Sequence, residues 1–458
     1  MAIPEVVASQ RAFFDSQATR SVDFRIQQLK KLETILRNNE DDLAVAIYAD
    51  LKKSRYDMIT TELSLVLGEI STAIKKLPAW TKKQRVATNL VNFPARSYRL
   101  AEPYGVTYIA GAWNYPYQLT LLPLVSAMAA GNTAVIKPSE LAVNTSHTLA
   151  KLINENFPSE YIHVIEGGAE TATEILQQKF DKIFFTGGAR IGKIVYEAAA
   201  RQLTPVTLEL GGKNPAIVLP DCNISVTAKR LVWGKFLNAG QSCVAPDYLL
   251  VHSSIEQKLL GEMKRLLDKY FSTEKITENF MAIVDDRHFE RLKGLINPDK
   301  VFYGGVTKKE DRFISPTILR NMTFDDDVMK EEIFGPILPA IRFDSLDDVV
   351  KKITRYEKPL SFYVYGKKSE TTEKLFNNFS FGGGSLNDSV MYFGNSNLPL
   401  GGIGASGIGA YHGYEGFKTF SHYKSIMEKG MWIEFWFLKS PPYAEWKLKI
   451  LRFLLEKL

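Results

Sequence analysis

The first 80 residues place apolar side chains at the spacing of an α-helix. In the segment 22–51 several of these side chains fall along one face of a helix, at Phe24, Leu29, Leu32, Ile35 and Leu36. An amphipathic helix shows this pattern because one stripe of its surface is buried and the opposite stripe meets water. The segment before residue 80 is therefore predicted to be helical.

After residue 100, short apolar runs alternate with helical patterns. The first five runs occupy residues 105–111, 133–138, 161–167, 182–187 and 205–211. A second region of the same kind begins near Gly211, and its apolar runs occupy residues 214–220, 248–254, 315–320 and 361–366. Such alternation is typical of a parallel sheet with crossover helices, so the sequence predicts an α/β fold. The glycine-rich segment from Gly382 to Gly413 is predicted to be a loop.

The stretch from Pro103 to Ile136 contains no charged residue, and its length would suit a membrane span. Helix-breaking and turn-forming residues interrupt it, at Gly111, Asn114, Pro116, Pro123, Gly131 and Asn132. The pattern instead favours two short buried strands with a helix between them.

The C-terminal tail, residues 433–458, is first aromatic and then basic and amphipathic. One helical stripe would hold Trp446, Ile450, Phe453, Leu454 and Leu458. A helix packed on the protein or on a second subunit is the favoured interpretation, and a peripheral contact with a membrane surface is the alternative. The nearby aromatic residues suit either a substrate entrance or subunit contacts, and they are Trp432, Phe435 and Trp436.

The composition restricts the class of protein. A length of 458 residues favours two or more domains, and 45% apolar with 24% charged residues is typical of soluble globular proteins. The formal charge of +6 is small for this length and gives no indication of nucleic-acid binding. Two cysteines cannot form a disulfide framework and the N-terminus shows no secretory signal, so a cytoplasmic enzyme is expected. The six histidines show no metal-ligand spacing, and no metal site is predicted.

Cys243 is the first candidate for catalysis. A thiolate is the nucleophilic form of cysteine, and it needs a polar and partly open setting. Small and polar residues precede Cys243 at 238–242, a run that suits a loop approached closely by a ligand. The alternative is a buried packing residue. Cys222 lacks such surroundings and is predicted to be inert.

Glu209 is the second candidate, because it interrupts an apolar run between Leu208 and Leu210. Burial of this acid would raise its pKa toward neutrality, so that it could take a proton from water. The alternative is a solvent-facing glutamate at the edge of a strand. Asn114 is the third candidate, since its amide is a donor of the kind that holds an oxyanion, although asparagine is equally typical of a turn.

Glycines join the apolar run 182–187 to a helical pattern, where backbone N–H groups at a helix N-terminus can hold a pyrophosphate. These glycines are Gly187, Gly188 and Gly192. A literal G-x-G-x-x-G also occurs, at Gly402, Gly404 and Gly407. It lacks a preceding strand and a following helix, so it is predicted not to bind a dinucleotide.

Six short motifs occur in the order found in the aldehyde dehydrogenase superfamily: WNYP, KPSE, FTGG, LELGGK, GQSC and EEIFGP. The resemblance covers residues 1 to about 425. The short N-terminus and the segments GQSCVAPDYLL and GAYHGYEGFKTFSH resemble the class 3 branch, which includes fatty and aromatic aldehyde dehydrogenases. The resemblance implies a Rossmann-like cofactor domain, an α/β catalytic domain and a small β-hairpin oligomerisation element. The implied boundaries are 1–81 with 101–209, then 210–417, and 82–100 with 418–432.

The same resemblance implies a role for each matching residue. Cys243 is the implied nucleophile, Glu209 the general base and Asn114 the oxyanion donor. The implied cofactor-binding residues are Lys137, Glu140, Thr186, Gly187, Gly188, Gly192, Glu332 and Phe334. Gly188 departs from the family, which usually has serine there, and this departure weakens the expected contacts with the pyrophosphate.

The implied activity is NAD(P)-dependent oxidation of an aldehyde to a carboxylic acid through a thiohemiacetal and a thioester. Medium-chain, long-chain or aromatic aldehydes and a homodimer are expected. NAD is the expected cofactor because Glu140 should repel a 2′-phosphate, yet the class 3 branch often accepts NADP as well. The alternatives are a coenzyme A-acylating relative, against which Glu209 counts, and a non-catalytic protein that keeps the fold.

Overall fold

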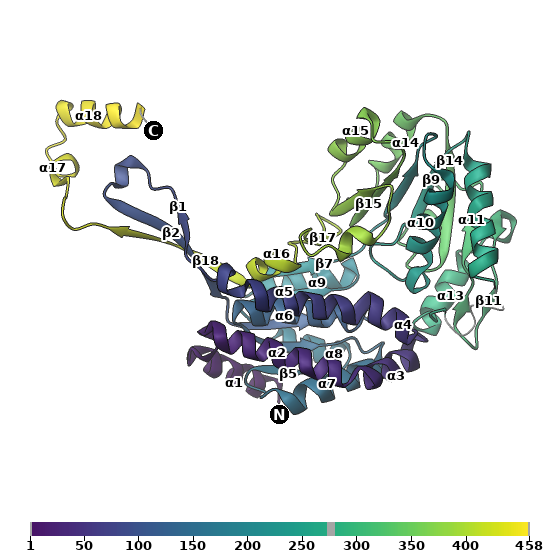
Figure 1. Cartoon of the computed structure of the whole chain (residues 1–458), viewed down its shortest axis with the longest axis horizontal. Helices are drawn as coiled ribbons and strands as arrows, with labels where there is room; N and C mark the ends of the chain where they lie inside the picture. The colour runs from purple at the N-terminus through teal and green to yellow at the C-terminus, as the bar shows by residue number, and fades with distance from the viewer. Residues whose placement is uncertain (1, 273–279, 457–458) are drawn as a thin grey trace.

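The computed structural model describes residues 2–272 and 280–456, which form two large sheets with helices around them (Figure 1). The first sheet has six strands, in the order β17 (Gly407–Ile408), β7 (Val206–Glu209), β6 (Lys182–Thr186), β3 (Val106–Ala110), β4 (Thr133–Lys137) and β5 (Ile162–Val164). The strands from β7 to β5 are parallel, and β17 runs antiparallel to β7. The parallel α/β organisation predicted from the sequence is confirmed.

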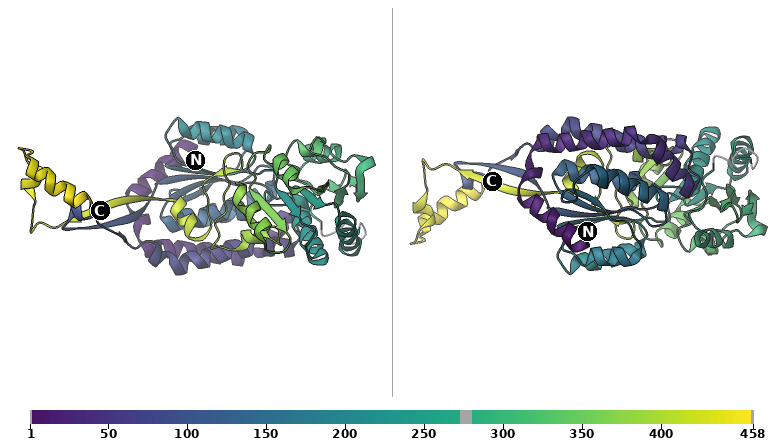
Figure 2. Two further views of the ribbon diagram at one scale, coloured as in Figure 1. Left: turned by 90° about the horizontal axis from the view of Figure 1, so that it is seen from above. Right: turned by 90° about the horizontal axis from the view of Figure 1, so that it is seen from below.

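Helices cover both faces of this sheet (Figure 2). One face packs on α6 (Gln118–Ala130) and α7 (Val143–Asn156), and the other packs on α1 (Ile3–Asp15), α8 (Ala169–Leu176) and α9 (Ala189–Ala200). Every residue of β3, α6 and β4 is buried, so the prediction of a buried strand–helix–strand unit between residues 103 and 136 is confirmed. Among the described helices, none is long and apolar enough to cross a membrane.

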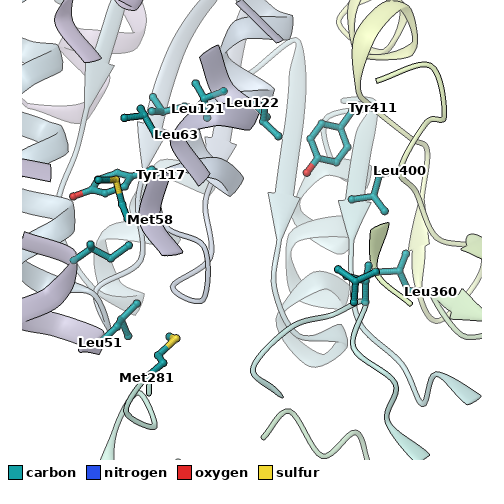
Figure 3. Packing of buried hydrophobic residues seen from close by; sticks show 14 of the residues in the cluster. Leu51, Met58, Leu63, Tyr117, Leu121, Leu122, Met281, Leu360, Leu400 and Tyr411 are labelled. Atoms are coloured by element: carbon teal, nitrogen blue, oxygen red, sulfur yellow. The ribbon is translucent and has the colours of Figure 1, made fainter. Parts of the chain in front are cut away.

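The N-terminal segment is helical, as predicted. After α1 it forms α2 (Val22–Asn38), α3 (Glu40–Leu51), α4 (Arg55–Met58), the π-helical turn η2 (Ile59–Leu63) and α5 (Ser64–Trp80). The apolar stripe of α2 is buried at Leu29, Leu32, Ile35 and Leu36, whereas Phe24 is half-buried. Figure 3 shows Leu51, Met58 and Leu63 from these helices near Tyr117 at the start of α6. The helices thereby pack on the loop between β3 and α6.

The second sheet has seven strands, in the order β10 (Val301–Tyr303), β13 (Thr317–Leu319), β14 (Ile337–Phe343), β9 (Tyr248–His252), β8 (Pro215–Val218), β15 (Ser361–Tyr365) and β16 (Gly383–Leu386). A separate pair joins β11 (Thr307–Lys308) to β12 (Phe313–Ile314). The helices of this region are α10 (Ile224–Phe236), α11 (Glu256–Tyr270), α13 (Asp286–Gly294), α14 (Leu346–Ile353) and α15 (Glu370–Asn378). All four predicted strands of this region are present.

The glycine-rich segment 382–413 was predicted to be a loop, and that prediction is wrong for two parts of it. β16 is the edge strand of the second sheet, and β17 closes the edge of the first. Glycine weakens the sequence signal of a strand, but here it permits close approach: a Cβ at Gly384 would clash with the carbonyl oxygen of Phe362. β17 belongs to the first sheet, so the range 210–417 implied for the catalytic domain includes one strand of the sheet of the cofactor domain.

A third sheet projects from the body, with β2 (Ala95–Pro103) between β1 (Gln84–Val86) and β18 (Ser421–Lys429) (Figure 1). α16 (Gly413–Thr419) leads into β18, and the tail forms α17 (Trp436–Lys439) and α18 (Glu445–Glu456). Within the described part of the predicted stripe, Trp446 is 50% exposed and Ile450 is 39% exposed, so this part of the stripe is not buried against the body of the same chain. Leu458 of the predicted stripe lies outside the described residues.

Candidate active site

A cavity of about 890 Å³ opens where the parallel strands of the first sheet end and the second region begins. Ligands of open α/β sheets commonly bind beyond the carboxyl ends of the strands, because the loops that follow the strands converge there. Ten of the eleven predicted site residues line this cavity: Asn114, Lys137, Glu140, Thr186, Gly187, Gly188, Glu209, Cys243, Glu332 and Phe334. The structure therefore brings together residues that are far apart in the sequence.

Gly192 is the predicted residue that does not line the cavity. It lies inside α9, where a Cβ would come within 2.8 Å of the Leu210 side chain. The glycine lets α9 pack closely on the end of β7, which is a different task from contact with a ligand.

Cys243 follows a turn whose backbone is left-handed at three successive residues. The φ angles are 57° at Asn238, 52° at Ala239 and 69° at Gly240. This conformation is costly for residues other than glycine and occurs often at functional sites. A Cβ at Gly240 would clash with the carbonyl oxygen of Gly335, so this position needs glycine. The turn directs the chain into the cavity just before Cys243.

Gln241 fastens this turn to its surroundings. Its side chain is fully buried, donates to the Ala282 carbonyl at 3.0 Å and accepts from the Val284 N–H at 3.1 Å. Its own carbonyl accepts from Asn114 Nδ2 and from Asn238 Nδ2, both at 3.1 Å. The sequence predictions did not assign Gln241 a role, because a buried glutamine has no signal that separates it from other polar residues of the run.

Cys243 keeps some accessible surface on the cavity wall, yet it lies deep enough for burial to dominate its acidity. Its pKa is raised to about 12, mainly because burial disfavours the thiolate and also because Glu332 and Glu209 carry like charge. The backbone N–H groups of Cys243 and Val244 act in the opposite direction. The resting thiol is thus protonated at neutral pH and needs a base, or a nearby positive charge, to react.

Asn114 is buried in the loop between β3 and α6. Nδ2 carries two hydrogens, and one of them is used in the bond to the Gln241 carbonyl. The Asn114 carbonyl accepts from Asn238 Nδ2 at 2.9 Å, which ties the two loops together. One Nδ2 hydrogen therefore remains for a ligand beside Cys243.

Glu209 is the last residue of β7 and is buried. Neither of its carboxyl oxygens has a hydrogen-bond partner among the described residues. Burial raises its pKa well above the ordinary range. The alternative of a solvent-facing strand-edge glutamate is therefore excluded, and the orphaned carboxyl group is suited to proton transfer.

The opposite end of the cavity has features that suit a dinucleotide. Lys137 is buried at the end of β4, and its Nζ lies 2.9 Å from Glu140 Oε2, whose side chain is about half exposed. Within the part of the chain that the structure describes, the buried Thr186 hydroxyl has no hydrogen-bond partner, and no side chain caps the N-terminus of α9 at Gly188. An unsatisfied hydroxyl, free helix N–H groups and an acid near the rim fit a pyrophosphate and a ribose.

Glu332 and Phe334 line the cavity between these two ends. Burial raises the pKa of Glu332 to about 8, although the Gly212 N–H and the side chains of Lys213 and Arg291 lower it. Phe334 has a φ of 51°, which is unusual for an aromatic residue, and its ring meets that of Trp113 edge-on at 5.4 Å. Trp113 also lines the cavity, and its position directly before Asn114 is the signal that could have found it.

Comparison with known proteins agrees with this geometry. The model of the Aldehyde dehydrogenase family matches residues 2–426. The chain belongs to the aldehyde dehydrogenase family. It is similar to a 4,4'-diaponeurosporen-aldehyde dehydrogenase of Staphylococcus aureus, with 44% identity over 94% of this chain and 95% of that protein. A dimeric NADP-preferring aldehyde dehydrogenase of Canis lupus familiaris is 42% identical over 93% of this chain and 94% of that protein.

A solved structure of the substrate-bound state of Staphylococcus aureus AldH matches this aldehyde dehydrogenase with a TM-score of 0.96 and 43% identity. The match covers 99% of this chain and 100% of that one. The recognition from six short motifs and the predicted fold class are both confirmed. The protein is an NAD(P)-dependent aldehyde dehydrogenase, and the cavity contains residues that fit such a cofactor.

The literal G-x-G-x-x-G takes no part in the cavity lining of this aldehyde dehydrogenase. Gly404 and Gly407 form a β-bridge, and Gly407 belongs to β17. No helix starts directly after this motif, as the sequence predicted. Among the residues that the structure describes, no group of three or more histidine, cysteine, aspartate or glutamate side chains is placed to hold a metal ion.

Proposed function

We propose that this aldehyde dehydrogenase converts aldehydes to carboxylic acids by covalent catalysis at Cys243. The Cys243 thiol gives its proton to a base, and the resulting thiolate attacks the aldehyde carbonyl, so that a C–S bond forms and the carbonyl oxygen becomes an oxyanion. The observation that carries the proposal is that one cavity holds Cys243, Glu209 and Asn114, a buried acid and an amide donor beside a thiol. Because burial raises the pKa of Cys243, another group of the site must accept its proton before the thiol can react.

Asn114 and the backbone N–H of Cys243 stabilise the oxygen that becomes negative in the tetrahedral adduct. Donors fixed in advance lower the barrier because they need no reorganisation when the charge develops, and loss of one such donor costs about 100- to 1,000-fold in rate. Asn114 suits this task because its amide is held by Gln241 and its backbone by Asn238.

Glu209 completes the reaction as the general base for hydrolysis of the thioester. Its carboxylate takes a proton from water while the oxygen attacks the acyl carbon, and the Cys243 thiolate leaves. A pKa well above the ordinary range makes the carboxyl group a better proton acceptor than an exposed glutamate. Neither of its oxygens has a partner among the described residues, so each can accept a hydrogen bond from a water molecule.

The nicotinamide cofactor, when bound, accepts the hydride of the substrate. In this proposal Lys137 and Glu140 would bind the adenosine ribose, and Thr186 with the N-terminus of α9 would bind the pyrophosphate; that all of them line the same cavity supports these roles. Glu332 and Phe334 lie where they can hold the nicotinamide half beside Cys243.

The decisive experiment measures NADH formation from aldehydes of graded chain length by the parent enzyme, by Cys243→Ala and by Cys222→Ala. Cys222 is half-buried at the start of α10 and does not line the cavity, so it is the matched control. We expect loss of turnover only in Cys243→Ala. Parental turnover by Cys243→Ala would refute the covalent mechanism.

We propose that NAD is preferred over NADP. A 2′-phosphate on the ribose would lie near the negative charge of Glu140, and Lys137 is already paired with that carboxylate. Measurement of kcat/KM with both cofactors tests the preference, and Glu140→Gln is expected to shift the ratio toward NADP. One relative is named as NADP-preferring, so a strong preference for NADP in the parent is the outcome that would refute this proposal.

We propose medium-chain, long-chain or aromatic aldehydes as substrates. Tyrosines surround the nucleophile: Tyr115, Tyr363 and Tyr411 are buried and Tyr392 is half-buried. Burial raises their pKa values most, and the charge of Cys243 raises each of them further, so all four lie near Cys243. An aromatic environment near the nucleophile favours an apolar substrate. A rise in kcat/KM with chain length supports this substrate class, and a preference for acetaldehyde contradicts it.

We propose that two subunits associate through the projecting sheet. β18 is a nine-residue edge strand, and exposed apolar side chains lie around it, at Val86, Phe93, Met427, Met431 and Trp432. Unpaired strand edges with apolar surface are typical of interfaces. Trp432 contacts Phe93 of this sheet and does not line the cavity of its own chain, so it is placed for subunit contacts. Sedimentation equilibrium tests for a dimer, and a monomer at micromolar concentration contradicts it.

We propose a cytoplasmic enzyme whose tail can rest on a membrane surface. The exposed apolar stripe of α18 carries Trp446 and Phe453, and its basic residues would face anionic lipids. Co-sedimentation with anionic vesicles should be lost after removal of residues 440–458, and equal binding by both forms would contradict the role of the tail. Both described cysteines are free, as expected in a reducing compartment.

A further inference from the structure

A buried ion pair lies behind the loop that carries Asn114. Lys53 Nζ is 2.6 Å from Glu62 Oε1, and the side chains are 2% and 0% exposed. Lys53 lies between α3 and α4, and Glu62 lies in the π-helical turn η2. Neither residue lines the cavity, so neither can touch the substrate or the cofactor there.

The second carboxyl oxygen of Glu62 holds the start of α6. Oε2 accepts the N–H of Tyr117 at 2.8 Å and the N–H of Gln118 at 3.3 Å. The first N–H groups of a helix have no partner within the helix, and the positive end of the helix dipole favours an anion there. Glu62 therefore fixes the point where the Asn114 loop becomes a helix.

Lys53 contacts the same loop at Tyr115, the residue that directly follows Asn114. Its Nζ lies 4.1 Å from the centre of the Tyr115 ring, in the position of a cation–π contact. The side chain of Ser242, the neighbour of Cys243, lies close enough to the Tyr115 hydroxyl to lower the pKa of Tyr115 against the larger effect of burial. These contacts join the ion pair to Tyr115, the residue after Asn114, and through Tyr115 to Ser242, the residue before Cys243.

Stability alone is a poor explanation for this pair. Two charges lose their hydration on burial, and buried ion pairs are often replaced by apolar residues without loss of stability. Burial indeed lowers the pKa of Lys53, against the opposing effects of Glu62 and Asp57.

Turns of the π type are rare and occur frequently at functional sites, and this one directs Glu62 inward. Figure 3 shows Met58, which precedes the turn, and Leu63, its last residue, near Tyr117.

We propose that Lys53 and Glu62 are positioning residues that fix Asn114 in place for the oxyanion. The inference rests on the proposed role of Asn114. Trp113 on one side of Asn114 meets Phe334, and Tyr115 to Gln118 on the other side are held by the ion pair. The side-chain amide of Asn114, which lies between these two anchored parts of the loop, can therefore stay in a fixed position during the reaction. Small displacements of such a donor are costly, because the rate depends steeply on the geometry of the reacting groups.

A double-mutant cycle tests this proposal. The Lys53→Met/Glu62→Ala variant removes both anchors without leaving an unpaired buried charge, and Lys53→Met/Glu62→Gln serves if the first does not fold. The first-turnover rate of NADH formation at saturating NAD is measured with and without Asn114→Ala. We expect a fall of about tenfold in the parent and of less than about twofold in the Asn114→Ala background, because residues that act through one group are not additive.

Glu69→Gln is the matched control. Glu69 on α5 is also a buried acid that accepts a backbone N–H, from Gly413 at 2.7 Å, but it holds α16 rather than the Asn114 loop. Its rate should stay within about twofold of the parent. Equal falls in both backgrounds, or no fall in the parent, would overturn the positioning role. A parental rate in Asn114→Ala alone would instead refute the oxyanion role of Asn114, so the two failures are distinguishable.

Discussion

Glu209 and Gly407 are strand partners across the edge of the first sheet. β17 pairs antiparallel with β7 at this point, and Thr186 of β6 pairs with Glu209 from the other side. The backbone of Glu209 is thus held by strands on both sides, while its carboxyl oxygens have no partner among the described residues. The fold fixes the position of this acid and leaves its side chain free for proton transfer.

Gly407→Ala should weaken this arrangement. Gly407 has a φ of 153°, and a Cβ there would clash with the Leu208 carbonyl oxygen. We expect a loss of about 1–3 kcal/mol in the free energy of unfolding together with a lower kcat. Thermal unfolding and steady-state rates measure both effects. Gly68→Ala in α5 is the control, because a Cβ there meets nothing within 4 Å and should not destabilise the protein.

Glu209→Gln should separate the two halves of the reaction. The glutamine cannot take a proton from water, so the thioester should form and then persist. We expect one NADH per active site in a rapid burst, followed by turnover reduced by about 100- to 10,000-fold. Stopped-flow absorbance records the burst, and mass spectrometry of the intact protein records the acyl group on Cys243. Steady turnover at the parental rate would show that another group activates the water.

Gly188→Ser tests the point where the sequence departs from its family. Gly188 is the N-cap of α9 in an extended conformation, and a Cβ there would meet nothing within 4 Å. Serine therefore fits, and its hydroxyl adds a donor for the pyrophosphate. One hydrogen bond of this kind should lower the Kd of NAD by about three- to tenfold. Calorimetric titration measures the Kd, and Gly261→Ser in α11, where a Cβ is also unhindered, is the control. Weaker binding of NAD by Gly188→Ser would contradict the assignment.

Lys182→Met should stabilise the protein, and more at low pH than at high pH. Lys182 is buried on β6 with the Thr207 hydroxyl as partner, and burial lowers its pKa to about 7. Between this value and the ordinary lysine value of 10.5, the unfolded chain binds a proton that the folded chain does not. The cost of folding is therefore complete below about pH 7 and vanishes above about pH 10.

Thermal unfolding of the parent and of Lys182→Met at about pH 6 and about pH 9 measures this difference. The gain in Tm should be larger at the lower pH. A gain that is equal at both values would show that Lys182 does not carry the predicted shift.

Local patterns were enough to predict most elements and the identity of the key residues. The buried unit from β3 to β4 was predictable because apolar runs of strand and helix length are separated by glycine and asparagine. Cys243 was identified because a reactive thiol follows a run of small and polar residues, and Glu209 because an acid interrupts an apolar run. By contrast, β16 and β17 escaped prediction because glycines carry no apolar signal, and their pairing is set by neighbours distant in the chain.

Residue type and spacing were sufficient to predict the alternation of strands and helices, the family and the candidate catalytic side chains. The folded chain was needed to show that the Glu209 carboxyl group has no hydrogen-bond partner among the described residues and that Asn114 donates to the Gln241 carbonyl. It was also needed to show that Lys53 and Glu62 meet behind the loop. Burial, pKa and partnership depend on segments that come together only on folding, and no local pattern contains that information.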